Sequence, residues 1–163
     1  MRTLRTTLLA LGAAAFLAAC SDQPTGTRTA PPPDAAQLDA IFASAASEFR
    51  VPADLLKSVG WVETRWQMVR GEEEFPGMPA AFGIMALRGE RLSTGARLAG
   101  VSAEKARHDA TANIRAAAAL LSSYADQLKI DRADLGAWAP AAARYTRRRS
   151  VGRGSSWPPP PRN

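Results

Sequence analysis

The chain of 163 residues contains one cysteine, one histidine and only three lysines. Because Cys20 is the single cysteine, no disulfide can form within this sequence, and folding has to rely on core burial. His108 is the single histidine, and one histidine does not make a metal centre by itself. No Ser–His–Asp or Cys–His catalytic set is recognised in the sequence, and its only cysteine lies in the N-terminal segment. A phosphate-binding glycine loop and an internal repeat are absent as well. We therefore expect no metal, no cofactor and a surface position for His108.

The first twenty residues have the pattern of a bacterial signal peptide. Arg2 and Arg5 supply a basic start, and the apolar run at 8–17 is too short to span a bilayer. The Leu-Ala-Ala-Cys at 17–20 resembles a lipobox, in which the cysteine is lipidated and becomes the new N-terminus. This resemblance implies a cell-envelope lipoprotein, anchored by palmitate or a related acyl chain on Cys20 at the periplasmic face of a bacterial membrane. A secretory signal that happens to end in cysteine is the alternative.

The basic charge of the chain is concentrated at its two ends. Nine of the 21 basic residues lie before residue 34 or after residue 143. The span between them holds 12 basic and 14 acidic residues, a net charge of about −2. This distribution argues against a nucleic-acid-binding domain. The length of the span fits one domain with one modest core, and we expect a monomer.

Composition divides the chain into a signal peptide at 1–20, a tether at 21–36, a domain at 37–146 and a tail at 147–163. The tether is rich in Ser, Thr, Pro and Gly, which predicts an extended linker. The tail is rich in Arg, Pro, Gly and Ser and cannot bury a core, so we expect it to be disordered. Two interpretations stay open: a basic tail attracted to anionic lipid or wall polymers, and a natural reading frame that is lost near Thr146.

Within the domain, helix signals dominate and strand signals are nearly absent, so we predict an all-α fold. Helical periodicity, with Asp34 and Asp109 as N-caps, predicts helices over about 34–50, 52–66, 92–98, 109–128 and 131–145. Asp131 or Asp134 is expected to open the last of these, and Pro140 to kink or shorten it. The glycines and prolines of 67–81 predict a long loop.

Glu63 is the carboxylate that first suggests chemistry. It lies near the end of its helix, one step off an expected core stripe of Leu55, Val59, Val62 and Trp66. Apolar neighbours disfavour the charged form of a carboxyl group, and Gly60 one turn earlier leaves room for a substrate to approach. A general acid is built in this way. An amphipathic helix with Glu63 at the water line is the alternative.

Three segments in order strengthen the interpretation of Glu63 as an acid. They are Val-Glu-Thr at 62–64, Ala-Phe-Gly-Ile-Met-Ala at 81–86 and Asp-Ala-Thr-Ala-Asn-Ile at 109–114. Together they resemble the marks of the lysozyme-like lytic transglycosylases (SLT-type), which cleave peptidoglycan. The resemblance covers roughly residues 38–145 and implies a lysozyme-like helical domain that acts on peptidoglycan glycan strands.

By this resemblance Glu63 is the catalytic acid, which protonates the glycosidic oxygen between N-acetylmuramic acid and N-acetylglucosamine. The same carboxylate then acts as base while a 1,6-anhydro sugar forms, so substrate participation replaces a second carboxylate. The resemblance places these residues beside the substrate: Thr64, Phe82, Gly83, Ile84, Met85, Asn113 and Tyr145. For Asn113 a structural role near the start of the long helix is the preferred alternative. The acidic run at 72–74 is either a source of a second carboxylate, which would permit hydrolysis, or a solvated loop.

The chain also departs from the family pattern. Ala86 stands where the family has Gln, Thr64 follows the acid where Ser is usual, and only Tyr145 remains of a Tyr-Asn-x-Gly turn. These departures keep other interpretations open: a peptidoglycan-binding lipoprotein without catalysis, a truncated N-terminal module of a larger wall hydrolase such as an amidase, or a structural lipoprotein. Trp61 and Trp66 are expected in the core, with stacking on sugars as the alternative.

Overall fold

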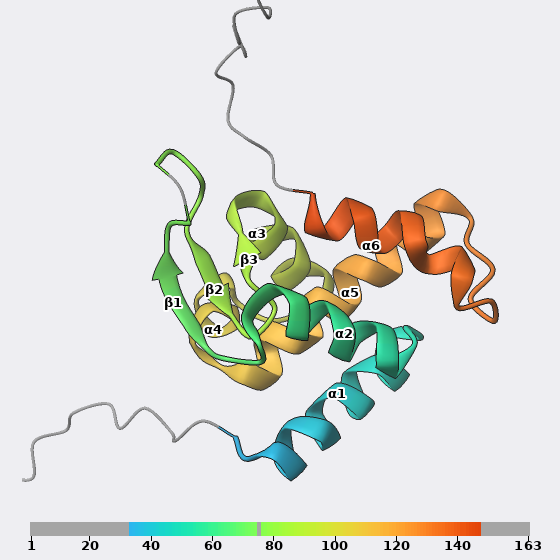
Figure 1. Cartoon of the computed structure of the whole chain (residues 1–163), viewed down its shortest axis with the longest axis horizontal. Coiled ribbons are helices and arrows are strands. Elements are labelled where there is room, and N and C mark those ends of the chain that lie inside the picture. The colour runs from blue at the N-terminus through green and yellow to red at the C-terminus, as the bar shows by residue number, and fades with distance from the viewer. Residues whose placement is uncertain (1–32, 75, 148–163) are drawn as a thin grey trace, which may run out of the picture. The chain divides into compact units, whose positions relative to one another are not determined.

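The computed structural model describes residues 33–74 and 76–147. The expected signal peptide with Cys20, the part of the expected tether up to residue 32 and the expected tail beyond Arg147 lie outside the described residues. The helices are α1 (Ala35–Phe49), α2 (Ala53–Thr64), α3 (Gly89–Leu98), α4 (Ala103–His108), α5 (Ala110–Leu128), η1 (Gly136–Trp138) and α6 (Ala139–Thr146). The strands are β1 (Val69–Glu72), β2 (Ala81–Gly83) and β3 (Leu87–Arg88), at the opposite edge of the helical body from α6 (Figure 1). Among the described helices, none is long and apolar enough to cross a membrane.

The expected helical character is confirmed, but an all-α description misses a small antiparallel sheet. Strand β1 lies inside the expected loop at 67–81 and pairs with β2, and β2 pairs with β3. Gly71, with φ +108°, occupies the position where the register between β1 and β2 shifts. Strands of two to four residues are too short to show the alternation that identifies a strand in a sequence.

Helix α5 forms the centre of the fold. It contacts α1, α3, α4 and α6. The residues that its helical spacing places inward are buried: Ile114, Ala117, Leu120, Leu121 and Tyr124. Many of the buried residues of α5 are alanines, which allow neighbouring helices to approach closely. At Gly95 of α3 a Cβ atom would lie only 2.6 Å from the main-chain oxygen of Ala116. The core therefore depends on small residues at the contact between α3 and α5 as well as on large apolar side chains.

The expected caps are confirmed at two helix starts, whereas the expected start of the last helix is wrong. The Asp34 carboxylate accepts from the main-chain N–H of Gln37, and the Asp109 carboxylate accepts from Ala112. Neither Asp131 nor Asp134 opens a long helix, because turns and η1 occupy the chain up to residue 138. Helix α6 begins only at Ala139, with Pro140 in its first turn, where the missing N–H costs no hydrogen bond.

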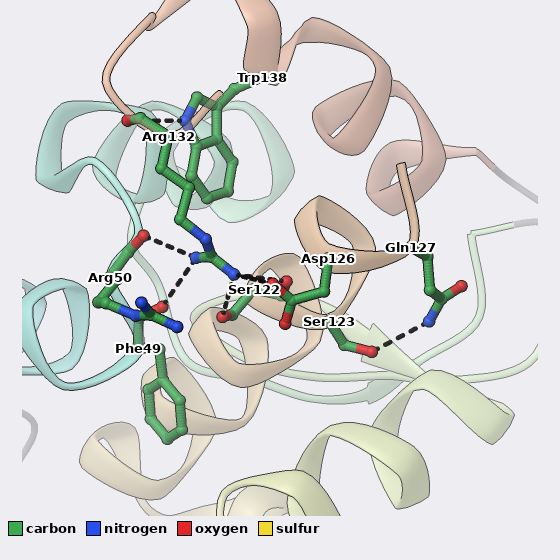
Figure 2. Close-up of polar contacts among 8 residues, drawn as sticks. All are labelled: Phe49, Arg50, Ser122, Ser123, Asp126, Gln127, Arg132 and Trp138. Atoms are coloured by element: carbon green, nitrogen blue, oxygen red, sulfur yellow. Dashed lines mark hydrogen bonds and ion pairs between the residues drawn. The ribbon is translucent and has the colours of Figure 1, made fainter. Parts of the chain in front are cut away.

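Arg132 ties the end of α1 to α5 (Figure 2). Its guanidinium donates to the main-chain oxygens of Phe49 (3.3 Å) and Arg50 (2.9 Å), at the C-terminal end of α1. The same group donates to the Ser122 hydroxyl and lies 2.6 Å from the Asp126 carboxylate on α5. A cation at the C-terminus of a helix is favoured by the helix dipole.

Candidate active site

The three segments that carry the family resemblance meet at one turn. Residues 83–86 join β2 to β3 and form a tight turn, which we call the 83–86 turn. Ile84 and Met85 are 1% and 0% exposed. Helices α2, α5 and α6 each place a hydrogen-bonding side chain against the main chain of this turn or of the strand that leads into it.

Asn113 on α5 supplies the deepest of these contacts. It is the buried polar residue of the described core, with no exposed surface. Its Oδ1 accepts from the N–H of Met85 (2.8 Å), and its Nδ2 donates to the main-chain oxygens of Phe82 (3.0 Å) and Ala106 (2.7 Å). Satisfying three buried main-chain groups is a structural role. In this position the Asn113 side chain has no surface through which to contact a substrate.

Gly83 has a structural reason to be glycine, because the side chain of Asn113 lies against it. Its φ of +73° lies in the left-handed region, which favours glycine. A Cβ atom at this position would lie 2.1 Å from the carboxamide of Asn113. The absence of a side chain therefore admits Asn113 beneath the turn.

Thr64 and Tyr145 hold the turn from two other helices. The Thr64 hydroxyl on α2 donates to the main-chain oxygen of Ile84 (2.5 Å), and the Tyr145 hydroxyl on α6 donates to that of Met85 (2.7 Å). Tyr145 is 3% exposed. Burial raises the pKa of its phenol well above the ordinary value, and the nearby Glu63 carboxylate raises it further. Tyr145 is therefore a neutral hydrogen-bond donor next to Glu63.

The buried face of α2 is not the expected one. Leu56, Val59 and Gly60 are buried, whereas Val62 is 71% exposed and Trp66 is 39% exposed, so the predicted core stripe is wrong at these two positions. Gly60 does not leave a path for substrate either. A Cβ atom there would lie 3.0 Å from the sulfur of Met85, so the glycine lets the 83–86 turn pack against α2.

Glu63 is half-buried and lies in a narrow recess with a cavity volume of about 10 Å³. The recess is lined by residues from α2, the 83–86 turn, β3, α3 and α6: Glu63, Ala86, Leu87, Arg88, Arg91, Tyr145 and Thr146. Typical small-molecule pockets hold roughly 300–1,000 Å³, whereas a cavity of about 10 Å³ holds about one water molecule. A ligand would therefore contact the residues at the mouth of the recess, and only a water-sized group would enter it.

Phe82 lies away from this recess. Its ring packs against the guanidinium of Arg107 (5.2 Å from the ring centroid) and the ring of His108 (6.5 Å), both on α4. His108 is exposed, as expected. In the acidic run, the Glu74 carboxylate lies 3.3 Å from the Arg88 guanidinium, and Glu73 is exposed.

The expectation that Trp61 and Trp66 belong to the core is wrong. Trp61 is 45% exposed, and its ring meets that of Trp66 edge-on at 5.1 Å. The Arg65 guanidinium lies 5.1 Å from the Trp61 centroid. Together with Val62, the two tryptophans line an open hollow on the outer side of α2. An exposed aromatic pair of this kind offers flat apolar faces with polar edges.

Sequence reasoning did not single out Arg88 and Arg91 as lining residues. The available signal was their position, because Arg88 ends β3 and Arg91 lies in the first turn of α3, two and five residues after the 83–86 turn. No family model matches the chain, and the searches of curated proteins and of solved structures also found no match.

Proposed function

We propose that the domain is a lysozyme-like lytic transglycosylase, which cleaves the bond between N-acetylmuramic acid and N-acetylglucosamine in peptidoglycan with Glu63 as its acid. The observation that carries the proposal is the convergence of the motif segments. Thr64 beside the acid, Asn113 and Tyr145 all hydrogen-bond to the 83–86 turn or to the strand before it, although they are far apart in the sequence. Their convergence places Glu63 at a recess whose wall is this turn and the start of α3.

In the proposed reaction the protonated Glu63 donates its proton to the glycosidic oxygen while the bond from this oxygen to the muramic acid C1 breaks. The departing sugar keeps the bonding electron pair and the proton. The carboxylate of Glu63 then takes the proton of the muramic acid O6 hydroxyl, and O6 bonds to C1 to give the 1,6-anhydro product. Glu63 returns to its protonated state, so no water and no second carboxylate are consumed.

The test is mass spectrometry of the products released from purified sacculi by the domain and by Glu63→Gln. We expect anhydro-muropeptides from the wild type and at least about 100-fold fewer from the variant, because general acid catalysis contributes about 10²–10⁴-fold. Glu104→Gln is the matched control, since this carboxylate is exposed on α4 and is not among the residues lining the recess. Reducing-end products would instead mean hydrolysis, and equal products from Glu63→Gln would refute the role of Glu63.

A glycan-binding protein without turnover is the second candidate. Two observations favour it: Ala86 brings no polar group to the recess, and Trp61 and Trp66 expose aromatic faces suited to stacking on sugar rings. This candidate predicts that the protein pellets with sacculi and releases no soluble products. Loss of pelleting in Trp61→Ala, with pelleting intact in Glu63→Gln, would favour it further.

We also propose that the protein is a lipoprotein of the cell envelope, anchored through Cys20. The support is the sequence alone, in the basic start, the apolar run and the Leu-Ala-Ala-Cys at 17–20. Metabolic labelling with an alkyne analogue of palmitate tests it. We expect label and membrane fractionation for the wild type and neither for Cys20→Ser, whereas a labelled Cys20→Ser protein would refute the anchor.

A further inference from the structure

Arg91, in the first turn of α3, is one of two arginines that line the recess and that no step of the proposed reaction uses. It is half-buried and lines the recess together with Glu63. One of its terminal nitrogens donates to the main-chain oxygen of Tyr145. A guanidinium has five N–H groups, and the others of Arg91 make no hydrogen bond to any residue in the described part of the chain.

The second arginine of the recess is held differently. Arg88 lies 3.3 Å from the Glu74 carboxylate and also donates to the main-chain oxygen of Pro79 (3.1 Å). Its side chain is only 11% exposed. The positive charge of Arg88 is therefore paired with Glu74, which is not among the residues that line the recess. Arg91 has no such carboxylate partner among the ion pairs of the described residues.

The charge of the recess changes with the state of Glu63. Arginine stays protonated in proteins at all ordinary pH values. When Glu63 is protonated, as a general acid must be before the reaction, Arg91 leaves the recess with a net positive charge. A ligand with an anionic group then gains binding free energy from a charge-assisted hydrogen bond to the arginine, whereas an uncharged ligand does not.

We propose that Arg91 binds a carboxylate of the glycan strand at the mouth of the recess and makes this site selective for acidic glycans over uncharged ones. The proposal rests on the glycan-cleaving function argued above. In peptidoglycan such a carboxylate comes from the lactyl group of muramic acid or from the peptide attached to it, whereas a polymer of N-acetylglucosamine has none. A planar guanidinium matches a carboxylate with two parallel hydrogen bonds, so Arg91 is a specificity-determining residue for the proposed reaction.

The test measures binding in the Glu63→Gln background, so that turnover does not interfere. Three probes are titrated by NMR or calorimetry: the N-acetylglucosamine–N-acetylmuramic acid disaccharide with its free lactyl acid, the same disaccharide carrying a peptide, and an uncharged N-acetylglucosamine oligomer. We expect at least one acidic probe to bind about tenfold or more tightly than the uncharged one, with a preference that shrinks as salt rises. The tighter of the two acidic probes identifies the source of the carboxylate.

Variants of Arg91 separate recognition from a merely structural role. Arg91→Gln should remove the preference, and Arg91→Lys, which keeps the charge and loses the planar pair of donors, should retain part of it. Arg97→Gln, an exposed arginine on the same helix, should leave the preference unchanged. If Arg91→Gln does not fold, the intermediate preference of Arg91→Lys remains the test. Equal binding of all probes by the parent, or an unchanged preference in Arg91→Gln or Arg91→Lys, overturns the proposal.

Failure of this proposal is distinguishable from failure of the proposed enzyme. If sacculi release no products while the Arg91-dependent preference is present, the catalytic proposal falls and carboxylate recognition stands. If anhydro-muropeptides appear and the preference is absent, the enzyme stands and the role of Arg91 falls.

Discussion

The two sides of helix α2 differ in what lies against them. On the inner side, Gly60 packs against Met85 and the Thr64 hydroxyl donates to the main chain of Ile84. On the outer side, Trp61 and Val62 face solvent beside an open hollow. Glu63 lies at the boundary, half-buried in its recess.

This difference separates two kinds of constraint on one short helix. The inner side is bound to buried main-chain groups that have no water to replace a lost partner, so substitutions there are expected to cost folding free energy. On the outer side the contacts are only partly buried, such as those of Trp66 with Phe42 and with the main-chain oxygen of Lys57. Substitutions there are expected to cost less folding free energy and to change ligand binding. An apolar, aromatic surface without a structural reason to be exposed is a candidate for contact with a ligand.

The largest expected effect is in the turn that packs against the inner side of α2, for Gly83→Ala. The added Cβ would overlap Asn113 and break its three hydrogen bonds, so we expect a loss of about 3 kcal/mol or more in the free energy of unfolding. Gly100→Ala is the matched control: its φ of +65° is similar and its Cβ would meet no atom within 4 Å. It should cost about 1–2 kcal/mol from backbone strain alone. Equal losses in urea unfolding would show that Asn113 does not anchor the turn.

An intermediate effect is expected for Tyr145→Phe, which removes the hydrogen bond to Met85 from a buried site. The free energy of unfolding should fall by about 1 kcal/mol at pH 7. The raised pKa of Tyr145 means that folding favours the neutral phenol, so its stabilising contribution is complete below the unfolded pKa of about 10 and is lost as pH rises towards the folded value.

The difference between wild type and Tyr145→Phe should therefore shrink above pH 10. Urea unfolding at pH 7, 9, 10.5 and 11 measures it. The other tyrosine, Tyr124, is present in both proteins and cancels from the comparison. A difference that grows with pH would contradict a neutral, buried Tyr145.

Relative to the number of atoms removed, the smallest effect on stability is expected on the outer side. Trp61→Ala should cost about 1–2 kcal/mol of the free energy of unfolding, less than a buried residue of the same helix, because the side chain is 45% exposed and its ring partner Trp66 is itself 39% exposed. Leu56→Ala, at a fully buried position on the inner side, should cost about 2–5 kcal/mol. If Trp61→Ala is nevertheless several-fold weaker in pelleting with sacculi, the outer side is a ligand-binding surface. Unchanged pelleting would leave its exposure without a functional reason.

The sequence by itself determined those parts of the fold that depend on neighbours along the chain. The caps at Asp34 and Asp109 are hydrogen bonds across three residues, and the inward side of α5 repeats over enough turns for its period to be read. The proposal that Cys20 is lipidated also rests on a local pattern, and it stays a prediction. Glu63 was found as a candidate from its position on one helix and from the segments that resemble a family.

Only the tertiary structure decided which side of α2 is buried. Both sides carry apolar residues, and the partner that selects Gly60 over Val62 is the 83–86 turn, more than twenty residues further along the chain. The same holds for Arg91, which joins Glu63 in one recess although they are 28 positions apart. Hydrophobic burial is non-directional, and so periodicity reveals the apolar sides of a helix but not which of them finds a partner.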